Sequence, residues 1–441
     1  MGALALIARR RGIPVTGSDN DLSGCADLVA LGAQVWQGSA SEAAKLARAV
    51  IVSAAVAATH PDLEAARAQN VPVIPRKQAL ADLVAAGRCI GIAGTHGKTT
   101  TTAMTTEAVA AAGLPVTGIA GGRVDSWGGN ARIAGSERDL FVVEADEFDQ
   151  AFLALHPAVA VITNVEADHL ECYDGSLDAL EEGFVKFAAG AGRVLIGNDS
   201  PGADRVSSRL ASSQVWRFGP GAGDLRIDDI TRTEQETRAS VTLPGWGRAL
   251  TLRLQVPGLH NVRNATAALG VVLALGGDPG RALPALARFS GVGRRFERLG
   301  QTAGIELVDD YAHHPTEIRA TLLAARQAYP TRRLVAVFQP HLFSRTALLG
   351  EEMGAALAAA DLAVVTDVYP AREAAIPGVT GQLVARAAER AGATVRYEPD
   401  RGGLAARVAA QLRPGDLLLT LGAGDITRLG REIVPLLGEN R

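Results

Sequence analysis

The stretch that decides the fold is Cys89-Ile90-Gly91-Ile92-Ala93-Gly94-Thr95-His96-Gly97-Lys98-Thr99-Thr100-Thr101-Thr102. An apolar run leads into spaced glycines, then Lys-Thr-Thr and a helical pattern, which predicts a strand, a phosphate-binding loop and a helix. Such glycines bring backbone N–H groups close to a polyphosphate, and the helix N-terminus adds partial positive charge. We expect Lys98 to reach the β- and γ-phosphates and the Thr99 hydroxyl to bind Mg²⁺. The spacing is shorter than G-x-x-x-x-G-K-[ST], and an ordinary glycine-rich turn is the alternative.

Length and composition narrow the class of protein. The 441 residues suggest about three domains of roughly 150 residues each. A net charge of −3 gives no basic footprint for nucleic acid. The cysteines lack disulfide or metal spacing, which fits a reducing cytosol. No apolar run approaches the ~18 residues of a membrane span, so we expect no membrane partner. Together with the charge and the cysteines, this predicts a cytoplasmic protein without nucleic-acid partners.

The first 84 residues alternate short helices and strands. Residues 1–12 predict a helix, and strands follow at Ile13–Thr16, Gln34–Trp36 and Ala49–Ser53. Asp19 comes just after the first of these strands, where nucleotide-binding folds hold a ribose hydroxyl. A solvated turn or a helix cap explains Asp19 equally well at this point.

Residues 88–290 alternate strands and helices, as expected for a mostly parallel sheet covered on both faces. One predicted strand runs into Glu144, and a later one leads to His169. Ligands of such sheets bind beyond the carboxyl ends of the strands, where the phosphate loop also lies. Glu144 is therefore the best-placed carboxylate for Mg²⁺, whereas a lone histidine such as His169 is as often structural.

Two polar segments follow. Asn261 and Asn264 are three residues apart at a predicted helix start and share a face, although capping by Asn261 is the favoured interpretation from spacing alone. Residues 288–298 are rich in glycine and arginine and predict a hinge. The paired Arg294 and Arg295 in this hinge could stabilise transferred phosphoryl charge, and a solvated basic linker is the alternative.

Residues 299–441 again alternate strands and helices, which predicts a second α/β domain with its own polar edge. One strand leads into Asp309-Asp310-Tyr311-Ala312-His313-His314-Pro315, and the next leads into Gln339-Pro340-His341-Leu342-Phe343-Ser344-Arg345-Thr346. The chain thus predicts two α/β edges loaded with polar side chains.

Taken together, these segments resemble the Mur ligases. The loop Gly94–Thr100 is common to that family, and the resemblance covers essentially the whole chain in order. The motifs that carry it further are Glu144-Ala145-Asp146-Glu147, Asn164-Val165-Glu166-Ala167-Asp168-His169, Asp309–Glu317 and Phe338-Gln339-Pro340-His341. These motifs point to the branch of the family that adds L-alanine to UDP-N-acetylmuramate.

The resemblance implies an α/β protein of three domains. These are a Rossmann-like UDP-sugar-binding domain (1–84), a central P-loop ATPase domain (85–293) and a Rossmann-like domain for the amino acid (294–441). It implies ATP and Mg²⁺ (or Mn²⁺), with the muramyl carboxylate activated as an acyl phosphate that the L-alanine amine then attacks. A monomer or a homodimer is expected. The family begins with a strand and a Gly-x-Gly-Gly-x-Gly loop, and this chain starts at about the following residue, so we expect the first domain to be N-terminally incomplete.

The resemblance also implies roles for particular residues. ATP contacts are expected from Gly94, Thr95, His96, Gly97, Lys98, Thr99, Thr100, Asn261, Asn264, Arg295 and Asp310, with Lys98, Glu144, His169 and Arg295 as catalytic residues. Metal ligands are expected at Thr99, Glu144 and His169, UDP-sugar contacts at Ser18, Asp19 and Ser53, and amino-acid contacts at Tyr311, His313, His341 and Arg345. Sister ligases carry a carbamylated lysine where this chain has Phe184, so no carbamate is expected; Leu342 replaces an arginine of some relatives.

Two alternatives remain at this stage. One is a ligase of the same family that recycles murein peptide. The other is a P-loop protein that binds nucleotide without ligation, which would show no turnover dependent on an acceptor.

Overall fold

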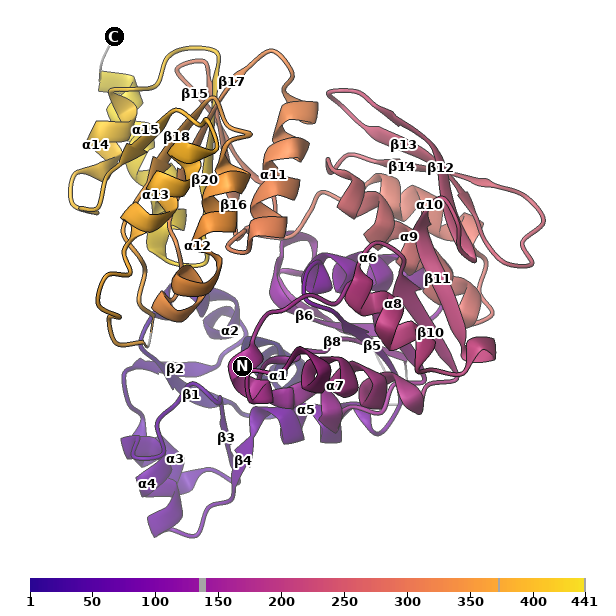
Figure 1. Ribbon diagram of the computed structural model, residues 1–441. Coiled ribbons are helices and arrows are strands. Elements are labelled where there is room, and N and C mark those ends of the chain that lie inside the picture. The colour runs from indigo at the N-terminus through magenta and orange to yellow at the C-terminus, as the bar shows by residue number, and fades with distance from the viewer. Residues whose placement is uncertain (135–139, 372, 440–441) are drawn as a thin grey trace. The chain divides into compact units, whose positions relative to one another are not determined.

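A computed structural model describes residues 1–134, 140–371 and 373–439 (Figure 1). The chain divides into two compact units. The first comprises residues 1–229, 239–252 and 263–287, and the second comprises residues 230–238, 253–262 and 288–441. Among the described residues, every helix is too short or too polar to cross a lipid bilayer.

The first unit begins with small α/β elements. Strands β1 and β2 pair in parallel, as do β3 and β4. The predicted strand Ile13–Thr16 is shifted, because the paired residues are Thr16–Asp19, while Ile13 is 53% exposed. The elements are α1 (Gly2–Arg10), β1 (Thr16–Asp19), α2 (Ala26–Ala30), β2 (Gln34–Gln37), α3 (Ser41–Leu46), β3 (Val50–Val52), α4 (Pro61–Ala68), β4 (Val73–Pro75) and α5 (Arg76–Val84).

The main sheet has the order β14-β13-β12-β11-β10-β9-β5-β8-β6-β7 in the described part of the chain. Its central strands β9, β5, β8 and β6 are parallel, as predicted from the alternating pattern. The strands are β5 (Arg88–Ala93), β6 (Val116–Val124), β7 (Gly129–Arg132), β8 (Leu140–Glu144), β9 (Val159–Ile162), β10 (Arg193–Gly197), β11 (Val215–Pro220), β12 (Leu225–Arg232), β13 (Thr237–Thr242) and β14 (Leu250–Leu254). The helices are α6 (Lys98–Ala111), α7 (Leu177–Ala189), α8 (Pro201–Ser208), α9 (Leu259–Ala274) and α10 (Pro279–Ala287).

One face of this sheet is covered by α1, α5, α7 and α8. Phe141 of β8, Ile162 of β9 and Phe184 of α7 belong to one buried cluster there. Apolar side chains occupy nearly every position of the central strands, because both faces of a parallel sheet are buried. The core therefore fixes the carboxyl ends of β5, β8 and β9, where the polar segments begin.

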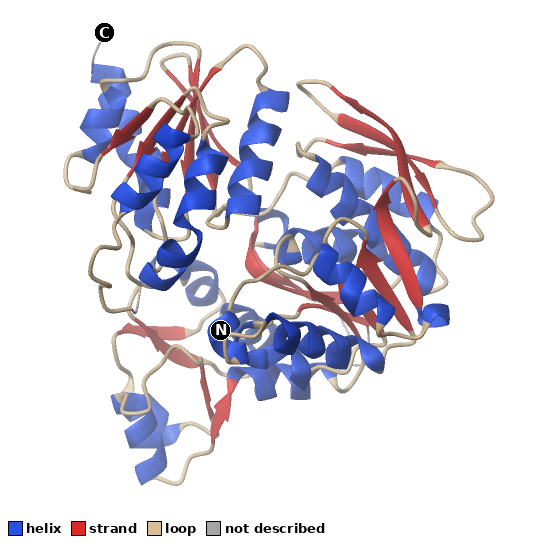
Figure 2. Ribbon diagram, viewed as in Figure 1, coloured by secondary structure: helices blue, strands red, loops and turns tan. Residues whose placement is uncertain are grey.

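The second unit holds a sheet of order β15-β16-β20-β17-β18-β19 in the described part of the chain. Its edge strand β15 is antiparallel to β16, and the other strands pair in parallel; strands are red in Figure 2. Alternating strand residues pack in two separate clusters, one with α11–α13 and the other with α14 and α15. The strands are β15 (Glu297–Thr302), β16 (Ile305–Asp310), β17 (Arg333–Phe338), β18 (Leu362–Val365), β19 (Val395–Tyr397) and β20 (Asp416–Leu421). The helices are α11 (Pro315–Ala328), α12 (Phe343–Leu357), α13 (Gly381–Arg390), α14 (Leu404–Ala409) and α15 (Leu429–Glu439).

The segment predicted as a hinge, residues 288–298, overlaps a strand at its C-terminal end. Glu297 begins β15, and the N–H of Phe296 donates to Asp310 Oδ2 at 2.7 Å. The N–H of Tyr311 donates to the carbonyl of Arg294 at 2.8 Å. Residues from 294 onward are therefore bonded to the end of β16.

Candidate active site

The loop between β5 and α6 has the backbone of a phosphate cradle. Gly94 has φ of +125° and Gly97 has φ of +80°, conformations that favour glycine. A Cβ on Gly94 would lie 2.1 Å from Thr163 Oγ1, so a side chain does not fit there. A Cβ on Gly97 would lie 3.1 Å from Asn264 Oδ1, which places the amide of Asn264 beside the loop.

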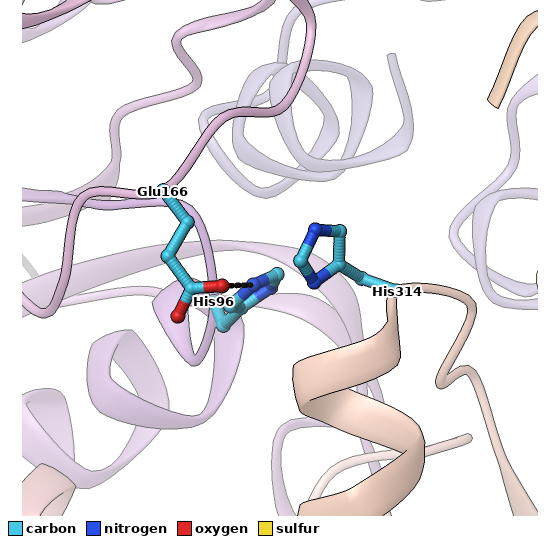
Figure 3. A group of neighbouring side chains, drawn as sticks. All are labelled: His96, Glu166 and His314. Carbon is cyan, nitrogen blue, oxygen red and sulfur yellow. Dashed lines mark ion pairs between the residues drawn. The ribbon is translucent and has the colours of Figure 1, made fainter. Parts of the chain in front are cut away.

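Residues after β9 hold this loop. The N–H of His96 donates to Asn164 Oδ1 at 2.9 Å, and the N–H of Glu166 donates to Thr95 Oγ1 at 2.8 Å. Thr163 Oγ1 donates to the carbonyl of His96 at 2.6 Å. His96 Nε2 lies 3.5 Å from Glu166 Oε2, and Figure 3 shows this pair. The motif that contains His169 thus also braces the phosphate loop, which the sequence analysis did not anticipate.

Lys98 is the first residue of α6, and its ammonium lies inside the loop. Its Nζ donates to the carbonyl of Gly94 at 2.8 Å and to Glu147 Oε1 at 2.9 Å, with Glu147 Oε2 at 2.8 Å. Burial alone would lower the pKa of Lys98, but the charges of Glu147, Asp146 and Glu144 outweigh burial and raise this pKa. Lys98 is therefore a cation held at the place where a phosphate loop presents one.

Glu144 is the last residue of β8 and is paired in register with Ile92 of β5. Its Oε1 accepts a hydrogen bond from Thr99 Oγ1 at 3.0 Å, and its Oε2 accepts one from the N–H of Gly121. Burial raises the pKa of Glu144, against the opposing hydrogen bond from Gly121 and charge of Lys98. A hydroxyl and a carboxylate in contact are the hard oxygen donors that Mg²⁺ prefers, so these residues fit that ion.

His169 lies after β9 with φ of +54°. Its ring packs edge-on against Phe148 with 5.2 Å between centroids, and its Nδ1 lies 3.5 Å from Glu171 Oε1. The contacts described for His169 are thus with neighbours of the carboxylate motif and of its own loop. Of the three predicted metal ligands, Thr99 and Glu144 are in direct contact, whereas the contacts of His169 given above are with Phe148 and Glu171.

Other predicted residues of the first unit have these surroundings. Thr100 is buried in α6. Ser18 Oγ donates to Asp62 Oδ2 at 2.6 Å, and Ser53 Oγ accepts from the N–H of Ala55 at 3.3 Å. Asp19 ends β1, and its Oδ1 accepts from the N–H of Asp21 at 3.1 Å. This hydrogen bond closes a local turn after β1, and a turn was the alternative interpretation of Asp19.

Asp62, which the sequence analysis missed, gathers several donors. Besides Ser18, the hydroxyls of Ser39 and Ser41 and the N–H of Ala40 bond to its carboxylate at 2.7–3.1 Å. Burial acts to raise the pKa of Asp62, but these hydrogen bonds outweigh burial and lower it. Nothing in the local sequence around Asp62 predicts that its carboxylate binds several donors, because these donors come from distant segments of the chain.

In the second unit, Asp310 ends β16 and is 6% exposed. Its carboxylate accepts from the N–H groups of Phe296 at 2.7 Å and Ala312 at 2.8 Å. Burial raises the pKa of Asp310 to about 6, partly opposed by the charge of Arg295. Asp310 therefore fixes the turn that presents Tyr311 and His313.

Two arginines meet Tyr311. The guanidinium carbons of Arg294 and Arg295 lie 4.8 Å and 5.0 Å from its ring centroid. Arg295 Nη1 lies 3.4 Å from Glu317 Oε1, whereas Arg294 Nη2 donates to the carbonyl of Gly422 at 2.6 Å. Arg295 thus stands beside an α11 carboxylate, whereas Arg294, the other arginine of the predicted pair, is bonded to the carbonyl of Gly422.

Three of the residues predicted to contact the amino acid, Tyr311, His313 and His341, form a row of aromatic rings. The ring of His313 lies 5.2 Å from that of Tyr311 and 6.1 Å from that of His341. His341 stacks on Tyr369 at 5.8 Å, and Arg345 Nη1 lies 3.5 Å from His341 Nδ1. The structure therefore brings all four predicted residues together and adds Tyr369.

Asn261, also in the second unit, lies within α9 and its Nδ2 donates to the carbonyl of Pro257 at 2.7 Å. Asn264 belongs to the first unit. Both residues lie in α9, as predicted, although the boundary between the two units falls between them.

Three family models match successive parts of this chain. Residues 1–88 match the model described as "Mur ligase family, catalytic domain". Residues 92–272 match "Mur ligase middle domain", and residues 294–424 match "Mur ligase, glutamate ligase domain".

Similar proteins and structures cover nearly all of the chain. A UDP-N-acetylmuramate–L-alanine ligase of Streptomyces coelicolor is 44% identical, covering 100% of this chain and 96% of that protein. One of Salinibacter ruber is 42% identical, covering 99% and 92%. The crystal structure of UDP-N-acetylmuramate-alanine ligase from Thermotoga maritima has a TM-score of 0.85 and 29% identity, covering 100% of this chain and 97% of that one. The fold is thus the three-domain α/β architecture of these enzymes, and this chain belongs to the Mur ligase family.

Proposed function

We propose that this chain is the ATP-dependent ligase that joins L-alanine to the lactyl carboxylate of UDP-N-acetylmuramate in peptidoglycan precursor synthesis. The observation that carries the proposal is the 42–44% identity, over almost the full chain, to ligases of that name. The phosphate loop, with Lys98 inside it and Thr99 against Glu144, supplies the matching chemistry.

We assign the ATP phosphates to the loop Gly94–Thr100, with Asn264 beside Gly97. Thr99 and Glu144 would hold Mg²⁺, with His169 as a further candidate ligand, and the ion would neutralise phosphate charge. Mn²⁺ offers the same oxygen chemistry. The proposal for UDP-sugar contacts at Ser18, Asp19 and Ser53 depends on family resemblance.

The reaction is balanced without any other reactant. A carboxylate oxygen of the sugar nucleotide bonds to the γ-phosphorus of ATP and ADP leaves. The amine of L-alanine then attacks the acyl carbon, loses a proton, and displaces phosphate as the amide forms. Phosphoryl transfer mainly needs positioning and charge stabilisation, which a cradle of N–H groups and a lysine provides.

From the second unit we assign Arg295, Asp310 and Asn261 to the nucleotide, and Tyr311, His313, His341 and Arg345 to L-alanine. The row of rings, with the guanidinium of Arg345 beside His341, supports the second assignment, since a cation is suited to an amino-acid carboxylate. We propose domain boundaries at residues 84/85 and 293/294, because residues from 294 onward are bonded to β16. A monomer or homodimer in the cytoplasm remains a prediction.

The test is release of ADP by the purified protein with MgATP, UDP-N-acetylmuramate and one acceptor. L-alanine, L-serine, glycine and L-alanyl-γ-D-glutamyl-meso-diaminopimelate are supplied in parallel. We expect turnover only with both the sugar nucleotide and an amino acid, fastest with L-alanine. Preference for the tripeptide would indicate a recycling ligase. Nucleotide binding without acceptor-dependent turnover would reject ligation.

A further inference from the structure

The cation of the phosphate loop already has an anionic partner from the same unit. Glu147 is only 1% exposed at its side chain, and both of its oxygens lie within 2.9 Å of Lys98 Nζ. The Tyr173 hydroxyl donates to the carbonyl of Glu147 at 2.8 Å, which fixes the backbone there. A carboxylate thus neutralises the lysine that a phosphate would contact.

The surroundings of this pair are anionic. The charges of Asp146 and Glu144 also act on Lys98. Backbone N–H groups of the loop attract phosphate, but the nearby carboxylates repel it through a poorly screened, buried environment. A nucleotide that arrives alone therefore meets less attraction than the loop sequence suggests.

We propose that Glu147 is a positioning residue that holds Lys98 in the loop and makes nucleotide binding depend on a divalent cation. Phosphate takes over Lys98 from Glu147 and leaves that carboxylate close to phosphate oxygens. A cation beside Thr99 and Glu144 offsets this repulsion. The proposal rests on the assignment of this loop to nucleotide phosphates.

Calorimetric titration of ADP, with Mg²⁺ or with EDTA, tests this inference. The measured quantity is the dissociation constant of ADP in EDTA divided by its dissociation constant in Mg²⁺. For the unsubstituted protein we expect Mg²⁺ to tighten ADP binding strongly. Glu147→Gln removes the charge with little change in shape, so we expect metal-free ADP to bind about tenfold more tightly while Mg-ADP changes less than about threefold. The ratio then falls accordingly.

Two further variants separate this effect from general charge loss or damage to the fold. Asp149→Asn removes a nearby charge whose partner is Lys77, at 3.1 Å, and we expect the ratio of the unsubstituted protein. Glu147→Asp keeps the charge and is expected to keep the metal dependence. The proposal is overturned if Glu147→Gln leaves the ratio unchanged, if Asp149→Asn lowers it equally, or if Glu147→Asp abolishes the dependence. Failure of the unsubstituted protein to bind Mg-ADP would instead reject the nucleotide site itself.

Discussion

Thr99 Oγ1 and Glu144 Oε1 lie 3.0 Å apart, one at the start of α6 and the other at the end of β8. The parallel pairing of β5 and β8 produces this contact, since it sets Ile92 opposite Glu144 just before the loop. The sheet register therefore places a carboxylate beside the phosphate loop. The remaining bond to the N–H of Gly121 orients the second oxygen.

Glu144→Gln tests the metal assignment. It keeps the shape of the side chain but removes the anionic oxygen that Mg²⁺ favours, so we expect turnover to fall by about 100-fold or more. The loss should shrink as MgCl₂ is raised, which steady-state rates across a magnesium series would reveal. Glu182→Gln, at a partly exposed carboxylate of α7 that pairs with Lys186, is the control. An unchanged magnesium dependence would remove Glu144 from the metal site.

Lys98→Ala should abolish turnover, because the charge that contacts phosphate is lost. The substitution should also lower the free energy of unfolding by about 3 kcal/mol, because buried Glu147 loses its cationic partner. Adding Glu147→Gln to Lys98→Ala should restore most of the unfolding free energy but none of the activity. Urea unfolding followed by circular dichroism, together with ADP release, checks both parts. Near-normal turnover in either variant would be inconsistent with a phosphate role for Lys98.

Gly94→Ala should disturb the loop strongly. Its φ is +125° and the new Cβ would lie 2.1 Å from Thr163 Oγ1, so strain and steric overlap combine. We expect a loss of about 3 kcal/mol or more in unfolding free energy, or a displaced loop without ADP binding. Gly128→Ala is the matched control, because φ is +63° there but nothing lies within 4 Å of a Cβ. Equal effects of the two substitutions would contradict the close approach to Thr163.

Asp310→Asn should alter how stability depends on pH. The folded pKa of Asp310 is about 6, above the ordinary 3.8, so the folded state binds more protons than the unfolded state between these values. The contribution of protonated Asp310 to the free energy of unfolding is therefore present below pH 4 and is lost as pH rises through 6. It amounts to about 3 kcal/mol. The variant lacks this loss, so its stability relative to the unsubstituted protein should improve from pH 4 to pH 7. A constant difference in urea midpoint between the variant and the unsubstituted protein across that range would contradict the raised pKa of Asp310.

Much of the architecture follows from local sequence pattern. Apolar runs before Gly94, Glu144 and Asp310 marked buried strands, and their carboxyl ends do carry polar side chains at the sheet edges. Strand ends shifted by a few residues, because pairing partners decide where a ladder stops. For example, the β1 strand begins at Thr16, opposite Gln34 of β2.

Contacts between distant segments were harder to predict. Glu147 was visible only as part of an acidic motif, and nothing local indicates that its carboxylate holds Lys98. Asp62 and Tyr369 could not be predicted for the same reason, since their partners Ser18 and His341 lie far away in the chain. Arg294 and Arg295 are neighbours of one type, yet only the fold distinguishes an anchor from a residue beside Glu317.

Transfer of ¹⁸O tests the central claim most directly. UDP-N-acetylmuramate labelled in both oxygens of its lactyl carboxylate is incubated with the protein, MgATP and L-alanine, and the released phosphate is analysed by mass spectrometry. Activation as an acyl phosphate predicts one ¹⁸O atom in each phosphate formed, in step with the amide product. Phosphate without label, released at the same rate as the amide, would contradict the account.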